Sequence, residues 1–423
     1  MADIIIDGIT VGANRFLILD STGKIPAVDG SLVTAIAAGN IATGTIPIAR
    51  VDTGTTANKI VVLDGSGRLP AVSAALITNL SSSTKSASDP TISTNPSGGV
   101  GTEWVNTTNG EIYICTDATA GANVWTNVGG GTGNVEPYIY QGTTYGYSHG
   151  GGNPDLDVIE RFSFTSDGNG VDVGNLVGVN EYVTGTHSTT HGYCQGGQST
   201  NRIEKYQFVA SANATLVGAL SQNRDSCGGL TSKTKGYTCG GYYPAAQRNE
   251  IWSYSYVSDG NATDVADISS IRLQPGGATD TINGYIMCGH SGPVPAITGV
   301  DKFVYATEAN STEIGDLTAG GQRMGGCSSL TYGYSVGSSY PVSDRIDKFN
   351  FSGTFTATDV GNLVQTVRGG MGCSSSTTYG YTSGYSTPAH GNEITKFSFS
   401  SDGNSTDVGD CTVTKGNSAA TSF

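Results

Sequence analysis

The stretch Gly236-Tyr237-Thr238-Cys239-Gly240-Gly241 joins a Gly-Tyr pair to a double glycine, and six Gly-Tyr pairs recur at regular intervals along the chain. Successive pairs are 44 to 49 residues apart and begin at Gly146, Gly192, Gly236, Gly284, Gly333 and Gly380. Self-similarity at a period of this length is typical of chains built from repeated supersecondary units. The C-terminal two thirds is therefore expected to contain six equivalent units.

The residues around each Gly-Tyr pair predict four short strands per unit. A stretch such as Ile203–Phe208 follows the pair, and nine residues after its second aromatic comes a Val-Gly-x-Leu-like element such as Val217–Leu220. Aromatic and β-branched residues favour strands, and turns such as Ser258–Asn261 separate them. Upstream, small-residue segments such as Gly325–Ser329 predict a further strand, often after an arginine (Arg224, Arg272, Arg323 and Arg368). Four strands in about 47 residues indicate a β-propeller blade.

The end of the sequence predicts that the array is closed. The spacing of the repeats places Phe423 in phase with Gly142, four residues before the first Gly-Tyr pair. We expect residues 415–423 to supply the first strand that the first unit lacks. Such an exchange removes exposed sheet edges, which promote aggregation in open arrays. The sequence thus predicts an all-β fold with a six-bladed propeller over residues 135–423.

Composition excludes several classes of function. Of 423 residues, 62 are glycine and 13% are charged, about half the usual fraction, which fits a turn-rich all-β protein. The net charge of −14 provides no basic field for nucleic acid or an anionic membrane. We find no secretory signal and no apolar run long enough for a membrane span. The eight cysteines form no C-x-x-C pair and are interpreted as mostly buried thiols.

The N-terminal residues contain a second repeat. The sequence of residues 13–28 returns 44 residues later in residues 57–72, and each copy predicts a strand, an Asp-x-x-Gly turn and a second short strand. Isolated hairpins are marginal in water, so these copies need partners, most simply copies of themselves. The predicted oligomerisation residues are Phe16, Ile18, Ile60 and Val62.

The repeats and the N-terminal residues resemble known protein families. The order of arginine, small residues, Gly-Tyr-x-x-Gly-Gly, aromatic strand and Val-Gly-x-Leu resembles the kelch family, although Val-Gly-x-Leu stands where kelch repeats usually have tryptophan. Residues 1–84 resemble the attachment repeats of bacteriophage tail fibres, which implies a homotrimeric stalk. Residues 85–134 resemble a small β module of phage appendage proteins and end in a glycine-rich linker at 129–133. The expected order is stalk, small module and propeller.

Variation in loop length points to one face of the propeller. The segment between the second and third strands of each unit varies from 11 to 16 residues, while the other intervals are nearly constant. In a four-stranded blade these loops all emerge on one face, and such loops commonly carry binding residues. The alternative is that loop length simply drifts. The candidate receptor-binding residues are Tyr242, Tyr243, His290, Tyr340, Tyr385, His390, Asp155 and Arg248.

Catalytic and metal chemistry have weaker sequence support. A glycosidase would need two opposed carboxylates, and the loop carboxylates Asp155, Asp157, Glu250, Asp344 and Glu393 are better interpreted as solvated residues or caps. The five histidines show no metal-ligand spacing, and the Asp-x-Asn turns lack the other ligands of calcium loops. We therefore expect no enzyme activity, cofactor or metal. The recurrent cations Arg161, Lys205, Lys302, Lys348 and Lys396 are expected to pair with turn carboxylates between blades.

The sequence therefore predicts a virion structural adhesion protein, similar to a phage tail fibre, assembled in the host cytoplasm and carried on the tail. Its N-terminus would bind other tail proteins and copies of itself, and the variable propeller face would bind a host surface glycan or protein. Two alternatives remain open at this stage. One is a fibre or decoration protein on the capsid, and the other is a depolymerase that cleaves host polysaccharide.

Overall fold

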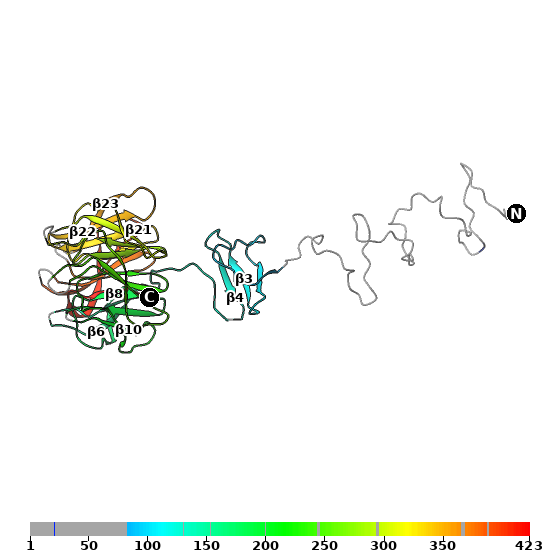
Figure 1. Ribbon diagram of the computed structural model, residues 1–423, viewed down its shortest axis with the longest axis horizontal. Helices are drawn as coiled ribbons and strands as arrows, with labels where there is room; N and C mark the ends of the chain where they lie inside the picture. Colours follow the sequence, from blue (N-terminus) through cyan, green and yellow to red (C-terminus); the bar gives the residue numbers. More distant parts are fainter. Residues whose placement is uncertain are drawn as a thin grey trace. The chain divides into compact units, whose positions relative to one another are not determined.

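The structure of the chain is a computed structural model that describes Ser21 and residues 83–129, 131–152, 154–198, 200–242, 246–292, 296–364, 369–386 and 389–423. All regular elements in these residues are β-strands (Figure 1). No helix among them is long and apolar enough to cross a membrane. The N-terminal hairpin repeats, with Phe16, Ile18, Ile60 and Val62, lie outside the described residues, as does Tyr243.

A small sheet precedes the repeated units. It is made of β1 (Thr84–Ser86), β2 (Glu103–Asn106), β3 (Ile112–Asp117) and β4 (Val124–Asn127). Strand β1 is parallel to β2, and β2 is antiparallel to β3. Tyr113, Cys115 and Trp125 are completely buried. These large side chains give the sheet an apolar centre of its own.

Residues Thr132–Phe423 belong to one compact unit that contains six four-stranded antiparallel sheets. In five sheets the strands lie side by side in the order in which they occur in the chain, and in the second sheet these strands are β8 to β11. The sixth has the order β28-β5-β6-β7. The strands are β5 (Tyr145–His149), β6 (Val158–Ser163), β7 (Val171–Asn175), β8 (Thr184–His187), β9 (His191–Gln195), β10 (Arg202–Gln207), β11 (Thr215–Ala219), β12 (Gly228–Thr231), β13 (Lys235–Cys239), β14 (Glu250–Ser255), β15 (Thr263–Asp267), β16 (Gly276–Thr279), β17 (Asn283–Met287), β18 (Gly299–Val304), β19 (Thr312–Asp316), β20 (Gly325–Ser328), β21 (Tyr332–Ser339), β22 (Val342–Asn350), β23 (Ala357–Asn362), β24 (Gly372–Ser375), β25 (Tyr379–Tyr385), β26 (Gly391–Ser398), β27 (Thr406–Lys415) and β28 (Ala419–Ser422).

The sheet that opens the unit takes its first strand from the C-terminal segment. Strand β28 pairs antiparallel with β5, with Ala420 opposite Ser148. The first strands of the six sheets contact one another in the order β8, β12, β16, β20, β24 and β28, and β28 contacts β8. This arrangement of four-stranded sheets is that of a β-propeller-like fold.

Small residues are required where the first strands meet. A Cβ atom on Gly277 would lie 2.1 Å from the carbonyl oxygen of Gly229, and one on Gly326 would lie 1.9 Å from that of Gly277. Real Cβ atoms do not approach backbone this closely, so a larger residue would push the strands apart. The small-residue segments in the sequence thus allow the first strands to pack backbone against backbone.

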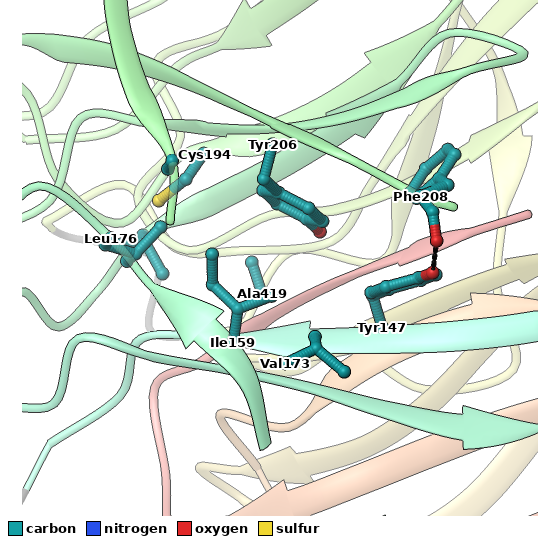
Figure 2. Close-up of a cluster of buried hydrophobic side chains, with 10 residues drawn as sticks. Tyr147, Ile159, Val173, Leu176, Cys194, Tyr206, Phe208 and Ala419 are labelled. Carbon is teal, nitrogen blue, oxygen red and sulfur yellow. Dashed lines mark hydrogen bonds between the residues drawn. The ribbon is translucent and has the colours of Figure 1, made fainter. Parts of the chain in front are cut away.

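The tyrosine of each Gly-Tyr pair packs between neighbouring sheets. It contacts the aromatic residue directly after the third strand of the next sheet, with ring centroids 4.7 to 5.1 Å apart. The pairs are Tyr147–Phe208, Tyr193–Tyr256, Tyr237–Tyr305, Tyr285–Phe351, Tyr334–Phe399 and Tyr381–Phe164. Figure 2 shows the first of these, in which the Tyr147 hydroxyl also donates to the Phe208 carbonyl oxygen. All six tyrosines are at most 1% exposed.

The glycine of the pair is needed for a different contact, within its own sheet. A Cβ atom on Gly333 would lie 2.2 Å from the ring of Phe349, and one on Gly380 would lie 2.3 Å from the ring of Phe397. In five of the six sheets the first aromatic of the third strand therefore lies over this glycine, whereas Leu230 of the preceding sheet lies over Gly284. Glycine and tyrosine recur together because they serve two contacts. The glycine leaves room for a side chain that packs over it, and the tyrosine ring packs against an aromatic residue of the next sheet.

The turns between the third and fourth strands also join neighbouring sheets. The amide oxygen of Asn213 accepts a bond of 3.0 Å from the Asn175 backbone N–H, and Asn169, Asn261, Asn310 and Asn404 make the same contact at 3.0 to 3.1 Å. These turn asparagines are therefore hydrogen-bonded to the backbone of a neighbouring sheet. A Cβ atom on Gly174 of the Val-Gly-x-Leu element would lie 2.5 Å from the Ala212 carbonyl oxygen. Glycine at this position therefore allows the turn of the next sheet to pack closely against the strand.

Three of the predicted lysine pairs between sheets are present. Lys205 contacts Asp259 at 2.5 Å, while Lys348 contacts Asp402 and Lys396 contacts Asp167 at 2.6 Å. Arg161 differs, because the facing turn at residues 211–213 carries no acid, and its guanidinium lies 4.5 Å from the centre of the Tyr145 ring instead. Six of the eight cysteines are buried, as expected.

Truncation of one stacked tyrosine tests the contribution of these contacts. We expect Tyr237→Ala to lower the free energy of unfolding by about 3–5 kcal/mol, because it removes a buried ring and the contact of that ring with Tyr305. Tyr237→Phe keeps the stack and loses the bond of 3.0 Å to Glu308, at a cost of about 1 kcal/mol. The control Tyr340→Ala, at a side chain 58% exposed, changes stability by less than about 0.5 kcal/mol. Urea unfolding measures all three, and equal effects of Tyr237→Ala and Tyr340→Ala contradict the expectation.

A buried histidine makes stability depend on pH. His149 is completely buried, and burial, with a smaller effect of the Lys415 charge, lowers its pKa to about 3. The unfolded chain binds this proton near pH 6.5, so folding is disfavoured progressively as pH falls from 6.5 toward 3, by about 1.4 kcal/mol per pH unit. We expect His149→Gln to show a shallower loss of stability across this window in pH-dependent urea unfolding. An unchanged slope contradicts the assignment.

Candidate binding site

The strand order brings two sets of connections to one face of the six-sheet unit. In each sheet the start of the first strand is paired with the end of the second, as Gly228 is with Cys239. The loop between the second and third strands therefore emerges beside the segment that leads into the first strand, which we call the entry segment. Tyr242, His290, Tyr340, Tyr385, His390, Asp155 and Arg248 all lie in or at the ends of these variable loops.

Three of the predicted residues are spread around this face and are not brought together. Tyr242 forms an isolated bridge with Asp225, His290 with Leu273, and Tyr340 with Gln322. Each bridge joins a variable loop to the entry segment of its own sheet. Tyr340 is 58% exposed and Tyr242 is 37% exposed, so both rings are available to a partner.

The other predicted residues lie in two environments. The Tyr385 hydroxyl donates to Glu393 at 3.1 Å, and the Arg248 N–H bonds the Gly241 carbonyl oxygen at 2.9 Å. The charges of Asp155 and His390, in contrast, both affect the pKa of Glu181, which lies in an entry segment. Burial, followed by the Asp155 charge, raises the pKa of Glu181, while Asn417, His390 and Arg323 oppose that rise. Two residues from distant loops are thereby placed near one carboxylate.

A ring of six residues in the entry segments is not predicted from the sequence. Each stands two residues before the first residue of a first strand, and each has a backbone φ between 54° and 66°. This left-handed conformation costs most residues roughly 1–2 kcal/mol, and only glycine adopts it freely. The members of this ring, which we call the entry ring, are Tyr182, Ser226, Gln274, Arg323, Gly370 and Asn417.

Backbone hydrogen bonds hold the entry ring together. The N–H of Ser226 donates to the Tyr182 carbonyl oxygen at 3.1 Å, and that of Gln274 donates to Ser226 at 2.8 Å. Equivalent bonds run from Tyr182 to Asn417, from Asn417 to Gly370 and from Gly370 to Arg323, at 2.6 to 2.9 Å. Strained backbone persists only where its surroundings impose it, and this occurs most often at functional sites.

The entry ring surrounds a cavity of about 160 Å³ at the centre of the face. The Arg323 guanidinium lies 5.2 Å from the centre of the Tyr182 ring. Its Nη1 and Nη2 atoms are 3.4 Å from the Asn417 amide oxygen and from the Tyr182 hydroxyl, respectively. The Asn417 Nδ2 atom lies 3.5 Å from Glu181. Aromatic, cationic and amide groups therefore meet at one side of the cavity, and the Glu181 carboxylate contacts the amide from outside the lining.

The structure separates Arg323 from the arginines with which the sequence analysis grouped it. Arg224 and Arg272 stand four residues before a first strand and are buried. Arg272 pairs with the buried Asp301, and Arg224 lies 3.8 Å from the centre of the Trp252 ring. Arg323 stands two residues before its strand and lines the cavity instead. The number of residues between each arginine and the following small-residue segment therefore distinguishes the two environments.

The opposite end of the space between the first strands is filled by the segment that enters the unit. The Tyr140 hydroxyl donates to the Ser329 carbonyl oxygen, and Gln141 donates to those of Ser328 and Ser376 at 3.1 and 3.2 Å. His187 Nε2 donates to the Tyr140 carbonyl oxygen at 2.7 Å. The chain thus arrives at the face opposite the variable loops.

Most buried carboxylates of the third strands have structural partners. Glu160 pairs with Lys415 and accepts two bonds from Thr412, while Asp301 accepts bonds from Ser269 at 2.8 and 2.9 Å. Each carboxylate thereby holds residues of the neighbouring sheet. Among the described residues, no group of three or more histidine, cysteine, aspartate or glutamate side chains is placed to hold a metal ion.

Comparisons with known proteins add little to this geometry. No family model and no curated protein matches the chain. Among the solved structures that match, one described as "Structure of YjhT" has a TM-score of 0.49 and 10% sequence identity over 56% of this chain and 86% of that chain. A match at this level carries no inference on function.

A glycine substitution in the entry ring tests whether its backbone is strained. We expect Gln274→Gly, at φ 57°, to raise the free energy of unfolding by about 0.5–1 kcal/mol, because relief of left-handed strain exceeds the entropic cost of glycine. The control Thr234→Gly, at an exposed loop residue outside the ring, should lower it by a few tenths of a kcal/mol. Thermal unfolding compares the two, and destabilisation by both argues against strain at Gln274.

Proposed function

We propose that the chain is a virion structural adhesion protein similar to a phage tail fibre. In this proposal residues 135–423 form a closed six-bladed kelch-like propeller that binds a host surface component through its variable face. Residues 1–84 attach the protein to the particle and assemble it as a homotrimer. The observation that carries the proposal is the separation of two faces, with the incoming chain on one and the entry ring with the variable loops on the other.

Contacts between the last and first sheets support the closed ring. Tyr381 packs on Phe164 at 4.7 Å, Lys396 contacts Asp167 at 2.6 Å, and the Asp410 N–H donates to Asn169 at 3.1 Å. These three contacts repeat those between consecutive sheets elsewhere in the unit. The first and last sheets therefore adjoin in the same way as the others, as a closed propeller requires.

The chemistry of the variable face supports a binding role. Exposed tyrosines at Tyr242 and Tyr340 offer apolar rings with a polar end, which suit sugar and polar protein surfaces. The carboxylates Glu250 and Glu393 are each engaged by a neighbour, Arg224 and Tyr385 respectively. Three propellers displayed on one stalk would strengthen attachment even where each contact is weak.

Comparison of the full chain with residues 132–423 tests the proposal. We expect the full chain to have the mass of a trimer in solution and the fragment to be monomeric, as measured by light scattering. Both should bind host cells, and the fragment should bind more weakly by about 10²-fold or more because avidity is lost. Tyr242→Ala with Tyr340→Ala should reduce binding of the fragment without changing its melting temperature.

Three outcomes contradict parts of this proposal. A monomeric full chain excludes the trimeric stalk. Binding by residues 1–131 without binding by the fragment excludes the propeller face as the receptor site. Release of soluble saccharide from host glycan by the fragment shows a depolymerase, and then adhesion alone is not the function.

A further inference from the structure

The cavity inside the entry ring has a distinct chemical character. Among the described residues that line it, Arg323 is the only one with a formal charge. None of the described carboxylates lies within 4 Å of its guanidinium, although most other arginines of the unit have such a partner. The two groups at 3.4 Å from its guanidinium, Asn417 and Tyr182, are neutral, and the nearby Glu181 carboxylate is held by Asn417 at 3.5 Å outside the cavity lining. A planar fork of donors is therefore left available for an anion.

Two residues that line this space have buried side-chain hydroxyl groups without a hydrogen-bond partner. Ser418 is only 7% exposed, lines the cavity, and has no hydrogen-bond partner for its side-chain oxygen. Ser374 is 3% exposed and equally unpartnered, deeper between the first strands. Buried polar groups are nearly always paired in native proteins, so an unpartnered hydroxyl beside a cavity indicates a site for a polar ligand or ordered water.

The remaining lining combines amides and apolar groups. Gln274 and Asn417 contribute amides from opposite parts of the entry ring, and Met324, Met371 and Pro275 contribute apolar surface. A sugar ring presents the same mixture, with hydroxyls at its edge and C–H groups on its faces. The cavity is smaller than the 300–1,000 Å³ typical of sites for drug-sized ligands, so it suits one small unit rather than a chain of them.

We propose that the entry ring binds a single sugar residue that carries a carboxylate, with Arg323 paired to the carboxylate and the Asn417, Gln274 and Ser418 side chains bonded to hydroxyls. The inference deepens the proposed adhesion function, on which it rests for its biological role. It names the receptor class as an acidic surface glycan whose exposed unit enters the cavity. The variable loops then contact whatever adjoins that unit.

The backbone strain of the entry ring is consistent with this role. A side chain on a left-handed residue is directed by backbone that neighbouring hydrogen bonds hold in place. Arg323, Asn417 and Gln274 are thus positioned before a ligand arrives, which reduces the ordering cost of binding. Gly370, the sixth member, has no side chain, and a Cβ atom there would lie 2.5 Å from the Asn417 amide oxygen, so its glycine keeps Asn417 in reach of Arg323.

Calorimetry on the full chain tests the inference with D-glucuronate, and with D-glucose and acetate as matched probes. We expect glucuronate to bind at least about tenfold more tightly than either probe, because only glucuronate offers both a carboxylate and ring hydroxyls. Arg323→Gln should remove this preference. Lys233→Gln, which makes the same charge change in an exposed loop on the opposite face, should retain it. Ser418→Ala should weaken glucuronate binding and leave the melting temperature unchanged.

Equal binding of glucuronate and glucose, or preference for glucuronate that survives Arg323→Gln, overturns the inference, as does the absence of any binding by glucuronate. Cell binding by the full chain is measured in parallel and separates this result from the proposed function. Adhesion without glucuronate binding refutes the sugar site and leaves adhesion standing. Glucuronate binding that depends on Arg323, without adhesion, supports the sugar site and refutes the proposed function.

Discussion

The stacking of each Gly-Tyr tyrosine on an aromatic ring of the next sheet is the interaction on which the six-sheet unit depends. Each of these four-stranded sheets completes its apolar core with aromatic rings from its neighbours. Because the contact recurs from Tyr147 through Tyr381, the sheets adopt one common spacing. That spacing in turn fixes how closely the first strands approach, which is why Gly229, Gly277 and Gly326 cannot carry side chains.

Repetition decided which features the sequence could predict. Features that recur in each repeat were predictable, because each copy supports the interpretation of the others. These features are the strand order, the tyrosine and aromatic positions, and the lysine pairs Lys205–Asp259 and Lys396–Asp167. The entry ring was missed because its members share a backbone conformation and no side-chain chemistry, and only Gly370 and Asn417 are of residue types that favour that conformation. Tyr140 was missed because it belongs to a segment that occurs once.

The division between the two faces follows from the same geometry. On one face, the turns and the incoming residues 138–141 are engaged in contacts that hold the sheets together. On the other, loops vary in length beyond their bridges to the entry segments, and the entry ring has backbone bonds of its own between neighbouring sheets. Variation and structural constraint are thus separated in space, which allows new surface chemistry to arise without loss of the scaffold.

The pairing of β28 with β5 has a consequence for how the molecule is made. Ala420 faces Ser148 across the sheet, although the two residues are about 270 positions apart in the chain. A ribosome adds residues at roughly 5–20 per second, so β5 waits many seconds with one edge open while the other five sheets are synthesised. Native pairing across such long loops is slow to form, and an unpaired strand edge during that interval can accept the wrong partner. Translation speed and chaperone protection during this interval should therefore govern the yield of correctly folded chains.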